Sequence, residues 1–351
     1  MKAVVKYGKE DGMVELRDVP VPEVGANDVL LEVHACGICG SDVEMWKGYS
    51  TNPINLPVIM GHEFCGIIGE VGSGVKEFKP GDRVVSETSA YVCGKCDLCR
   101  TGNYNLCPDR LGFGYGTDGA FTRYVKVREE ILHRIPGEVS FEEAAITEPV
   151  CVAYNAVAVN SHIKPGETVM IIGPGPIGLN SVQIAKVSGA GKVIVAGTGV
   201  DASRLKLAEI LGADIVIDSQ EKDVVEEVLD ITKGSGADLV IDAAGSPATL
   251  KQSLDMVKRS GQITKIGWGL APVDFSLDPL ILKAVTLQGS YSHNWNTWKN
   301  VLRLMEIGKV KTKLLISHIL PITEWEKGYK LVESREATKV ILKPVGVNNA
   351  E

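Results

Sequence analysis

Short apolar segments alternate with helical segments over the second half of this chain, and this alternation constrains the fold most strongly. Strands that alternate with helices lie parallel in one sheet, because each helix returns the chain to the same end of the sheet. The second half is therefore predicted to be an α/β domain with a doubly wound parallel sheet. The expected strands are Thr168–Ile172, Lys192–Ala196, Asp214–Ile217, Asp238–Ile241 and Gln262–Ile266.

A glycine-rich turn directly follows the first of these strands. Gly173, Gly175 and Gly178 form a Gly-x-Gly-x-x-Gly pattern, and a helical pattern opens at Pro176 and Ile177. Glycines at such a turn let backbone amides and the helix N-terminus approach a pyrophosphate. A purely structural turn is the alternative, but the strand before and the helix after favour a dinucleotide site.

The end of the next strand bears on which dinucleotide binds. An acidic residue about 20 residues beyond the turn would accept hydrogen bonds from the ribose hydroxyls, but the expected position falls near Gly199. Without a carboxylate there a 2′-phosphate meets no repulsion, and Thr198, Ser203 and Arg204 can donate to one. Asp201 is expected to cap the following helix. The sequence favours NADP over NAD and leaves both open.

The first half of the chain has a different pattern. Short β-rich segments such as Val29–Val33 and Asp82–Val85 are broken by Gly, Pro and Asn, which predicts a β-barrel with loops. Beyond about residue 290 the expected elements are helices at Trp298–Ile307 and Ile322–Glu333 and a strand at Lys339–Leu342.

Four cysteines within fifteen residues have the spacing of a zinc site: Cys93, Cys96, Cys99 and Cys107. Four thiolates can close a tetrahedron around one zinc ion with no open position, so this site would stabilise a loop rather than do chemistry. A disulfide pair or reduced thiols are the alternatives. A disulfide is disfavoured because nothing else in the chain is typical of a secreted protein.

A second set of metal-ligand types lies in the first half. Cys39 lies in a Cys-Gly-Ile-Cys-Gly-Ser-Asp segment, and His62 and Glu63 lie in a Gly-His-Glu segment. One thiolate, one imidazole and one carboxylate make a mixed zinc set that can leave a position open for substrate. Cys36 and Cys65 are expected to be packing residues.

Composition excludes several classes of partner. The chain has 351 residues and a net charge of −7, and it contains no Lys/Arg run of the density that nucleic-acid phosphates need. No run of about 18 apolar residues occurs and the N-terminus lacks a secretory stretch, so we expect no membrane partner and a cytoplasmic location. The length predicts two domains.

These motifs resemble those of the zinc-dependent medium-chain dehydrogenases, and within them the polyol branch that includes sorbitol, threonine and butanediol dehydrogenases. The resemblance runs from Lys2 to about Leu342, and the motifs follow the family's order and separations. It implies a GroES-like β-barrel catalytic domain at 1–152 and 290–351, with a structural zinc lobe at about 90–110. It also implies a Rossmann dinucleotide-binding domain at 153–289, two zinc ions per chain, and assembly as a homotetramer or dimer.

The resemblance implies a catalytic zinc held by Cys39 and His62, with a third position at Glu148. Glu148 can ligate directly, hydrogen-bond a zinc-bound water or exchange with Glu63, so Glu63 is either a ligand or a neighbour of the ligands. A surface carboxylate is the alternative for both. Cys151 is expected to pack rather than to bind metal.

The reaction of the family is oxidation of a secondary alcohol, in which zinc acts as a Lewis acid and the nicotinamide takes the hydride. Ser41 is the family's proton-relay hydroxyl, and Asp42 is expected to orient the loop. Polyol enzymes commonly have histidine where this chain has Glu44, so either Glu44 is a carboxylate relay or the proton leaves by another path. Trp46 and Tyr49 either line a substrate pocket or pack in the core.

The resemblance also places nicotinamide contacts in two later loops, at Ile266, Gly267 and Trp268 and around Ser290. His293 stands where sorbitol dehydrogenase has an arginine near its substrate, so sorbitol itself is not the expected substrate.

We therefore expect a zinc- and NAD(P)-dependent oxidoreductase that acts on a small-molecule substrate, a secondary alcohol of a polyol, sugar or sugar acid. A threonine or simple diol dehydrogenase is the alternative within the family, and Glu44 argues against a threonine enzyme. A non-catalytic cofactor-binding protein is the alternative from another class. Retention of Cys39, His62 and Glu148 together argues against it.

Overall fold

The computed structural model describes residues 1–50 and 53–346, which divide into two compact units. The first, here called the β unit, comprises Met1–Glu148, Asn294–Ile307 and the chain from Thr312 onward. The second, the α/β unit, comprises Pro149–His293 and Gly308–Lys311.

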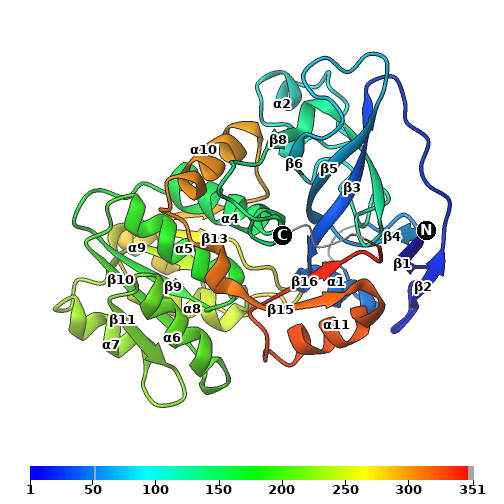
Figure 1. Cartoon of the computed structure of the whole chain (residues 1–351). Helices are drawn as coiled ribbons and strands as arrows, with labels where there is room; N and C mark the ends of the chain where they lie inside the picture. The colour runs from blue at the N-terminus through cyan, green and yellow to red at the C-terminus, as the bar shows by residue number, and fades with distance from the viewer. Residues whose placement is uncertain (51–52, 347–351) are drawn as a thin grey trace. The chain divides into compact units, whose positions relative to one another are not determined.

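The α/β unit is built on a six-stranded parallel sheet (Figure 1). In space the strands lie in the order β11-β10-β9-β12-β13-β14. Numbered by their place in the chain, this order is 3-2-1-4-5-6, which is typical of doubly wound dinucleotide-binding folds. The predicted sheet is confirmed. Its strands are β9 (Thr168–Ile172), β10 (Lys192–Gly197), β11 (Ile215–Asp218), β12 (Ala237–Asp242), β13 (Val257–Lys265) and β14 (Thr286–Gly289).

The core of this sheet is made by residues in register. Met170 on β9 pairs with Ile194 on β10 and with Val240 on β12, and all three side chains are buried in one cluster. Helices complete the layers: α5 (Pro176–Val187), α6 (Ala202–Leu211), α7 (Val224–Ile231), α8 (Pro247–Met256) and α9 (Asp278–Lys283). Helix α4 (Thr147–Tyr154) continues into a π-helical turn at Asn155–Val159, and a 3-10 turn spans Gly199–Asp201.

The β unit contains two sheets, as its β-rich sequence predicts. The smaller has the order β2-β1-β4 and the larger the order β15-β16-β3-β5-β6-β8, with β7 also paired to β3. The segment before β7 joins them, because Val4 N donates to Phe121 O (2.9 Å) and Val33 N donates to Arg123 O (2.8 Å). The strands are β1 (Lys2–Lys6), β2 (Val14–Asp18), β3 (Asp28–Gly37), β4 (Val58–Ile59), β5 (Glu63–Val71), β6 (Arg83–Ser86), β7 (Tyr124–Arg128), β8 (Leu132–Arg134), β15 (Ile316–Pro321) and β16 (Lys339–Lys343).

Short helices connect these strands. The last two, α10 and α11, lie close to the predicted ranges, but α10 begins earlier because the Asn294 side chain accepts a hydrogen bond from Thr297 N (3.3 Å) and caps the helix. None of the helices in the described ranges has the length and apolar character of a membrane span. The helices are α1 (Gly40–Trp46), α2 (Asp97–Arg100), α3 (Phe141–Ala145), α10 (Trp295–Glu306) and α11 (Trp325–Glu333), with 3-10 turns at Tyr104–Leu106, Glu129–Ile131, Thr312–Leu315 and Ile322–Glu324.

Candidate metal and cofactor sites

The β unit brings Cys39, His62 and Glu63 together, with one potential ligand atom of each within 4.8 Å of the others. Cys39 is the N-cap of α1, directly after β3, while His62 and Glu63 lie at the start of β5. Because β3 and β5 are antiparallel partners, the end of one strand meets the start of the other, with Gly37 opposite Glu63. Sheet pairing thus joins two segments that are far apart in the sequence.

Asp42 supports both of the first two ligands. Its Oδ2 accepts a hydrogen bond from Cys39 N (2.9 Å), which holds the loop as predicted, and its Oδ1 lies 3.6 Å from Nδ1 of His62. The second contact was not predicted. Burial alone lowers the pKa of His62, but the charges of Asp42 and Cys39 outweigh it and hold that pKa well above its usual value. A carboxylate facing Nδ1 leaves Nε2 as the nitrogen for a metal.

Glu63 is held by a lysine that the sequence patterns do not single out. Both side chains are buried, and Lys339 Nζ, at the start of β16, lies 2.5 Å from each carboxylate oxygen of Glu63. The same ammonium donates to Ile38 O (2.9 Å). Gly37 is needed here, because a Cβ at this position would lie 2.3 Å from Glu63 Oε2. A zinc ion that used Glu63 would compete with this ammonium, which favours a neighbouring role for Glu63.

The remaining predicted residues of this centre lie on two helices. Glu148, in the first turn of α4, is buried, and its charge is close enough to raise the pKa of Glu63, although burial is the larger cause. Ser41 and Glu44 are partly buried on α1 and are three residues apart, so they share one face of the helix. Partial burial raises the pKa of Glu44.

The donor types at this centre fit zinc, which binds thiolate sulfur, imidazole nitrogen and carboxylate oxygen. The other three cysteines are unsuited to it. Cys36, Cys65 and Cys151 are fully buried, burial raises the pKa of the first two thiols, and Cys65 Sγ donates to Phe141 O (3.0 Å).

The four-cysteine cluster has the geometry of a closed zinc site. Zn–S bonds of about 2.3 Å in a tetrahedron place the sulfurs about 3.8 Å apart, and Cys93 Sγ lies 3.6 Å from that of Cys107 and 3.9 Å from that of Cys99. These distances exclude an S–S bond of about 2.05 Å, and all eight cysteines are free. Hydrogen bonds from the amides of Lys95 and Cys96 lower the pKa of Cys93 to about 6, so it is a thiolate at neutral pH.

A buried polar network anchors this cysteine lobe to the sheet. Tyr104, between the third and fourth cysteines, donates to Glu87 Oε2 (2.6 Å), and His133 Nε2 lies 2.9 Å from Glu87 Oε1. The His133 ring stacks on Trp298 of α10 at 5.6 Å. Neither the tyrosine nor this glutamate carries a recognisable sequence signal.

In the α/β unit the glycine turn lies where the winding of the sheet reverses, between β9 and β12. Gly173 has a φ of +97°, and a Cβ on Gly178 would lie 1.9 Å from Gly173 O. A Cβ on Gly175, in contrast, would have no neighbour within 4 Å, and Pro176 occupies the first turn of α5. The turn therefore needs glycine for its own conformation and leaves open space at the helix N-terminus, as a phosphate site requires.

The residues after β10 are arranged differently from the expectation. Asp201 occupies the cap position of α6, but its carboxylate makes no cap bond there. Instead its Oδ2 accepts from Thr198 N (3.2 Å) and Oγ1 (2.9 Å), and its Oδ1 lies 3.4 Å from a guanidinium nitrogen of Arg204. Thr198 and Arg204, two of the three predicted phosphate donors, are thus turned toward a buried carboxylate, while the third, Ser203, is exposed. A second carboxylate was missed: Asp218, at the end of β11, lies 3.4 Å from where a Cβ of Gly199 would be.

The two later loops of the predicted cofactor site lie side by side. Trp268 is half exposed, and its ring is 5.8 Å from that of Tyr291, next to Ser290. Ser290 N donates to Lys265 O, and its hydroxyl accepts from the Asn160 side chain (3.0 Å). Ile266 is buried and Gly267 packs on a neighbouring loop.

Of the residues expected near the substrate, Trp46 is a packing residue, with its ring 5.7 Å from Tyr329 and 6.3 Å from Trp325 in the core of the β unit. Tyr49 is half exposed, and His293 is fully buried.

Comparison with known proteins gives consistent matches over the chain. The family model "Alcohol dehydrogenase GroES-like domain" matches residues 25–137, and "Zinc-binding dehydrogenase" matches residues 176–306. A sorbitol dehydrogenase from Halalkalibacterium halodurans is 41% identical over 98% of this chain and 100% of its own length. A D-arabitol-phosphate dehydrogenase from Enterococcus avium is 39% identical over 97% of each chain. Among solved structures, an alcohol dehydrogenase from Thermus sp. ATN1 matches with a TM-score of 0.89 and 34% identity, covering 98% of this chain and 100% of that one.

Proposed function

The chain belongs to the zinc-type medium-chain dehydrogenases, a family of NAD(P)-dependent alcohol dehydrogenases, and from this premise we propose that it oxidises a secondary alcohol of a polyol, sugar or sugar acid. The observation that carries the proposal is the grouping of Cys39, His62 and Glu63, with Glu148 beside them. The names of the sorbitol and arabitol-phosphate dehydrogenases that it resembles support a polyol substrate.

Two zinc ions per chain fit the two clusters found among the described residues. Cys39, His62 and Glu148 would hold the reactive ion, with Glu63 kept beside it by Lys339, and the four-cysteine lobe would hold the other. When bound, the reactive zinc supplies a Lewis acid for the substrate hydroxyl and the nicotinamide supplies the hydride acceptor.

The residues of the chain move the proton and position the ligands. Ser41 accepts the hydroxyl proton and passes it along α1 to Glu44, whose raised pKa suits a group that must take up and release a proton. Asp42 fixes the orientation of the His62 ring. In the α/β unit the glycine turn and the N-terminus of α5 bind the pyrophosphate.

We propose NAD as the preferred cofactor, in place of the preference for NADP that the sequence suggested. Thr198 and Arg204 face Asp201, and Asp218 adds a carboxylate near Gly199. Negative charge at this point accepts hydrogen bonds from ribose hydroxyls and repels a 2′-phosphate.

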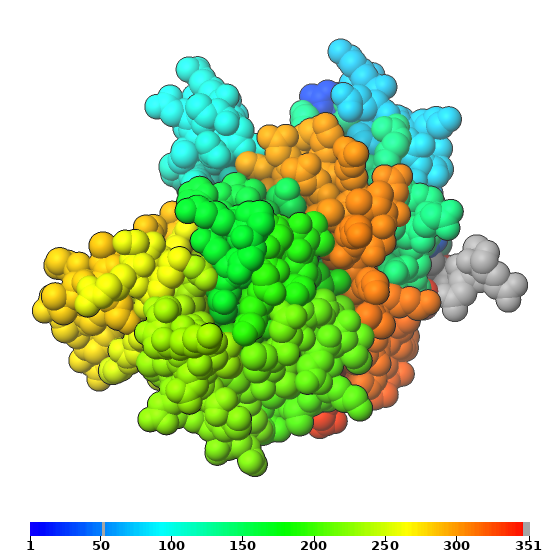
Figure 2. Space-filling model, turned by 90° about the vertical axis from the view of Figure 1, so that its left-hand side faces the viewer, coloured from blue at the N-terminus to red at the C-terminus, as the bar shows by residue number. Residues whose placement is uncertain are grey.

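The chain acts as a homo-oligomer through the β14 edge of the sheet. Among the residues that the structure describes, β14 pairs only with β13, and the segment near residues 260–285 (yellow) projects at the surface in Figure 2. On it three apolar side chains are largely exposed: Leu270 is 70%, Ile281 80% and Leu282 71% exposed. Exposed apolar side chains near a sheet edge are typical of an interface. Replacement of Ile281 by Glu should reduce the mass measured by light scattering, and an unchanged mass would place the interface elsewhere.

The free metal-binding thiols suit a reducing compartment, the cytoplasm.

A spectrophotometric screen of polyols, sugar acids and amino alcohols with NAD and NADP tests the reaction. Reduction of the dinucleotide is expected with a polyol or sugar acid, and the Cys39→Ser variant serves as the inactive control. Turnover only with threonine would identify the alternative reaction. No turnover with any secondary alcohol by the zinc-loaded protein would refute the proposal.

A further inference from the structure

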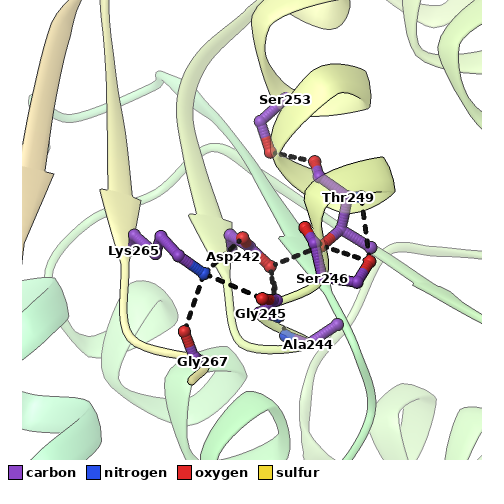
Figure 3. Close-up of polar contacts among 8 residues, drawn as sticks. All are labelled: Asp242, Ala244, Gly245, Ser246, Thr249, Ser253, Lys265 and Gly267. Carbon is purple, nitrogen blue, oxygen red and sulfur yellow. Dashed lines mark hydrogen bonds and ion pairs between the residues drawn. The ribbon is translucent and has the colours of Figure 1, made fainter. Parts of the chain in front are cut away.

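A lysine and an aspartate at the ends of two neighbouring strands join the two loops that follow those strands in the α/β unit. Asp242 is the last residue of β12 and Lys265 the last of β13, and the two residues are in register. Asp242 is fully buried, whereas about a third of the Lys265 side chain is exposed. Figure 3 shows both side chains pointing into the turn that follows β12.

The ammonium of Lys265 reaches both loops that leave these strands. Its Nζ donates to Gly267 O (2.8 Å) and to Gly245 O (3.1 Å), and it lies 3.4 Å from Asp242 Oδ2 (Figure 3). A lysine ammonium has three donors, so these three acceptors use all of them. Lys265 therefore has no donor left for a ligand unless one of these bonds breaks.

Asp242 binds the turn that follows β12 from its other side. Its Oδ1 accepts from the amides of Ala244 (3.2 Å) and Gly245 (2.9 Å) and from the Thr249 hydroxyl (3.1 Å), which belongs to α8. Charge-assisted hydrogen bonds of this kind are roughly twice as strong as neutral ones. The turn after β12 is thus fixed by one carboxylate and one ammonium.

The loops held in this way are packed too closely to move independently. A Cβ on Gly245 would lie 2.4 Å from the carbonyl carbon of Gly267, and one on Gly173 would lie 3.2 Å from Cβ of Ala244. The turns after β12 and β13 therefore form one assembly at the carboxyl edge of the sheet, and the glycine turn after β9 lies beside it without a bond to Lys265 or Asp242. Ligands of such folds bind at this edge.

We infer that Lys265 is a positioning residue that fixes the loop at Ile266–Trp268 for the nicotinamide end of the dinucleotide. This inference rests on the proposed function. It predicts that loss of the lysine affects binding of the nicotinamide end but spares the adenosine and pyrophosphate end, because the glycine turn keeps its own backbone geometry.

The same two strands offer a matched control. Lys258, near the start of β13, forms an ion pair with Asp238 near the start of β12, and its side chain is 34% exposed compared with 31% for Lys265. The Lys258→Met and Lys265→Met substitutions therefore each remove one ion pair between the same strands, at opposite ends of the sheet.

The test is calorimetric binding of NAD and of ADP-ribose, which lacks the nicotinamide, to the full chain. The Lys265→Met variant should bind NAD roughly tenfold more weakly and ADP-ribose as the wild type does, while Lys258→Met should leave both unchanged. Hydrogen exchange on the cofactor-free protein should be faster at residues 243–246 and 266–268 in Lys265→Met only. If Lys265→Met fails to fold, Lys265→Gln replaces it.

Equal weakening of NAD and ADP-ribose, unchanged NAD binding, or the same effect in Lys258→Met would each overturn the inference while leaving the dehydrogenase function in place. Wild-type protein that binds neither ligand would overturn the proposed function, and the inference with it.

Discussion

Lys339 places its ammonium 2.5 Å from Oε1 of Glu63, and the two side chains are buried although 276 residues separate them in the chain. Their contact joins the first residue of β16 to the first residue of β5. The pair lies directly beside Cys39 and His62. It therefore links the stability of the β unit to the charge around the proposed metal centre.

Removal of the lysine should be costly. The Lys339→Met variant leaves Glu63 buried without its counter-charge, and breaking a buried pair costs about 3–5 kcal/mol of unfolding free energy. Urea denaturation measures the loss. The double variant with Glu63→Gln should recover part of it, because the uncompensated charge is then gone. The matched control is Lys330→Met, which removes an exposed pair with Glu326 and should cost less than about 1 kcal/mol. Equal costs for the two lysines would contradict this account.

Zinc content should separate the two metal sites. We expect about two zinc ions per chain in the wild type and about one in Cys96→Ser or Cys39→Ser. Cys39→Ser should lose turnover and keep its melting temperature, whereas Cys96→Ser should melt earlier because the lobe loses its cross-link. Metal analysis with calorimetry measures both. One zinc in the wild type, or turnover by Cys39→Ser, would show that a site has been misassigned.

Sequence motifs predicted those parts of the two sites whose residues are close together in the sequence. The cysteine spacing and the glycine turn are each contained in one short segment, and in the structure the four cysteines lie together and the turn has a backbone that needs glycine. The Lys339–Glu63 pair could not be predicted in this way, because nothing in the apolar strand that contains the lysine marks its partner. Thr198 and Arg204 show a second limit: each can donate to a phosphate by its type, but Thr198 bonds the Asp201 carboxylate in a capping box and Arg204 pairs with the same carboxylate.

Glu44 gives a prediction with a defined pH dependence. The ionised carboxylate accepts the proton, so oxidation should rise with pH through the pKa of Glu44, which burial raises. In Glu44→Gln the rise of kcat with pH should disappear, and kcat should fall about tenfold or more. Glu44→His should keep a pH-dependent kcat, because its imidazole can also accept the proton. A pH profile of kcat for the three proteins measures it. An unchanged profile in Glu44→Gln would show that the proton leaves by another path.

The same raised pKa predicts an effect on stability. Because burial disfavours the ionised form, the folded state loses stability as pH rises from the unfolded pKa of about 4.3 through the raised value. Glu44→Gln removes this loss. Its melting temperature should therefore exceed that of the wild type at pH 7 and match it near pH 4. A difference of equal size at both pH values would indicate a packing effect instead.

Asp218 should set the choice between NAD and NADP. Its carboxylate lies beside Gly199, where the adenosine ribose of a bound dinucleotide is expected, and at this range a like charge costs about 1 kcal/mol in a solvated site, a factor of about five in affinity. Asp218→Asn should therefore raise the affinity for NADP relative to NAD by about fivefold.

The control for the net charge of the protein is Asp230→Asn, which makes the same change in charge at an exposed residue of α7. Dissociation constants for both dinucleotides are measured at low and at high salt. High salt should remove an effect of the protein's overall charge on NADP affinity, but it should leave much of the repulsion between Asp218 and a 2′-phosphate in direct contact with it. If the two variants changed the ratio equally, Asp218 would not be a determinant of cofactor choice, and Thr198 and Arg204 would again be the residues to test.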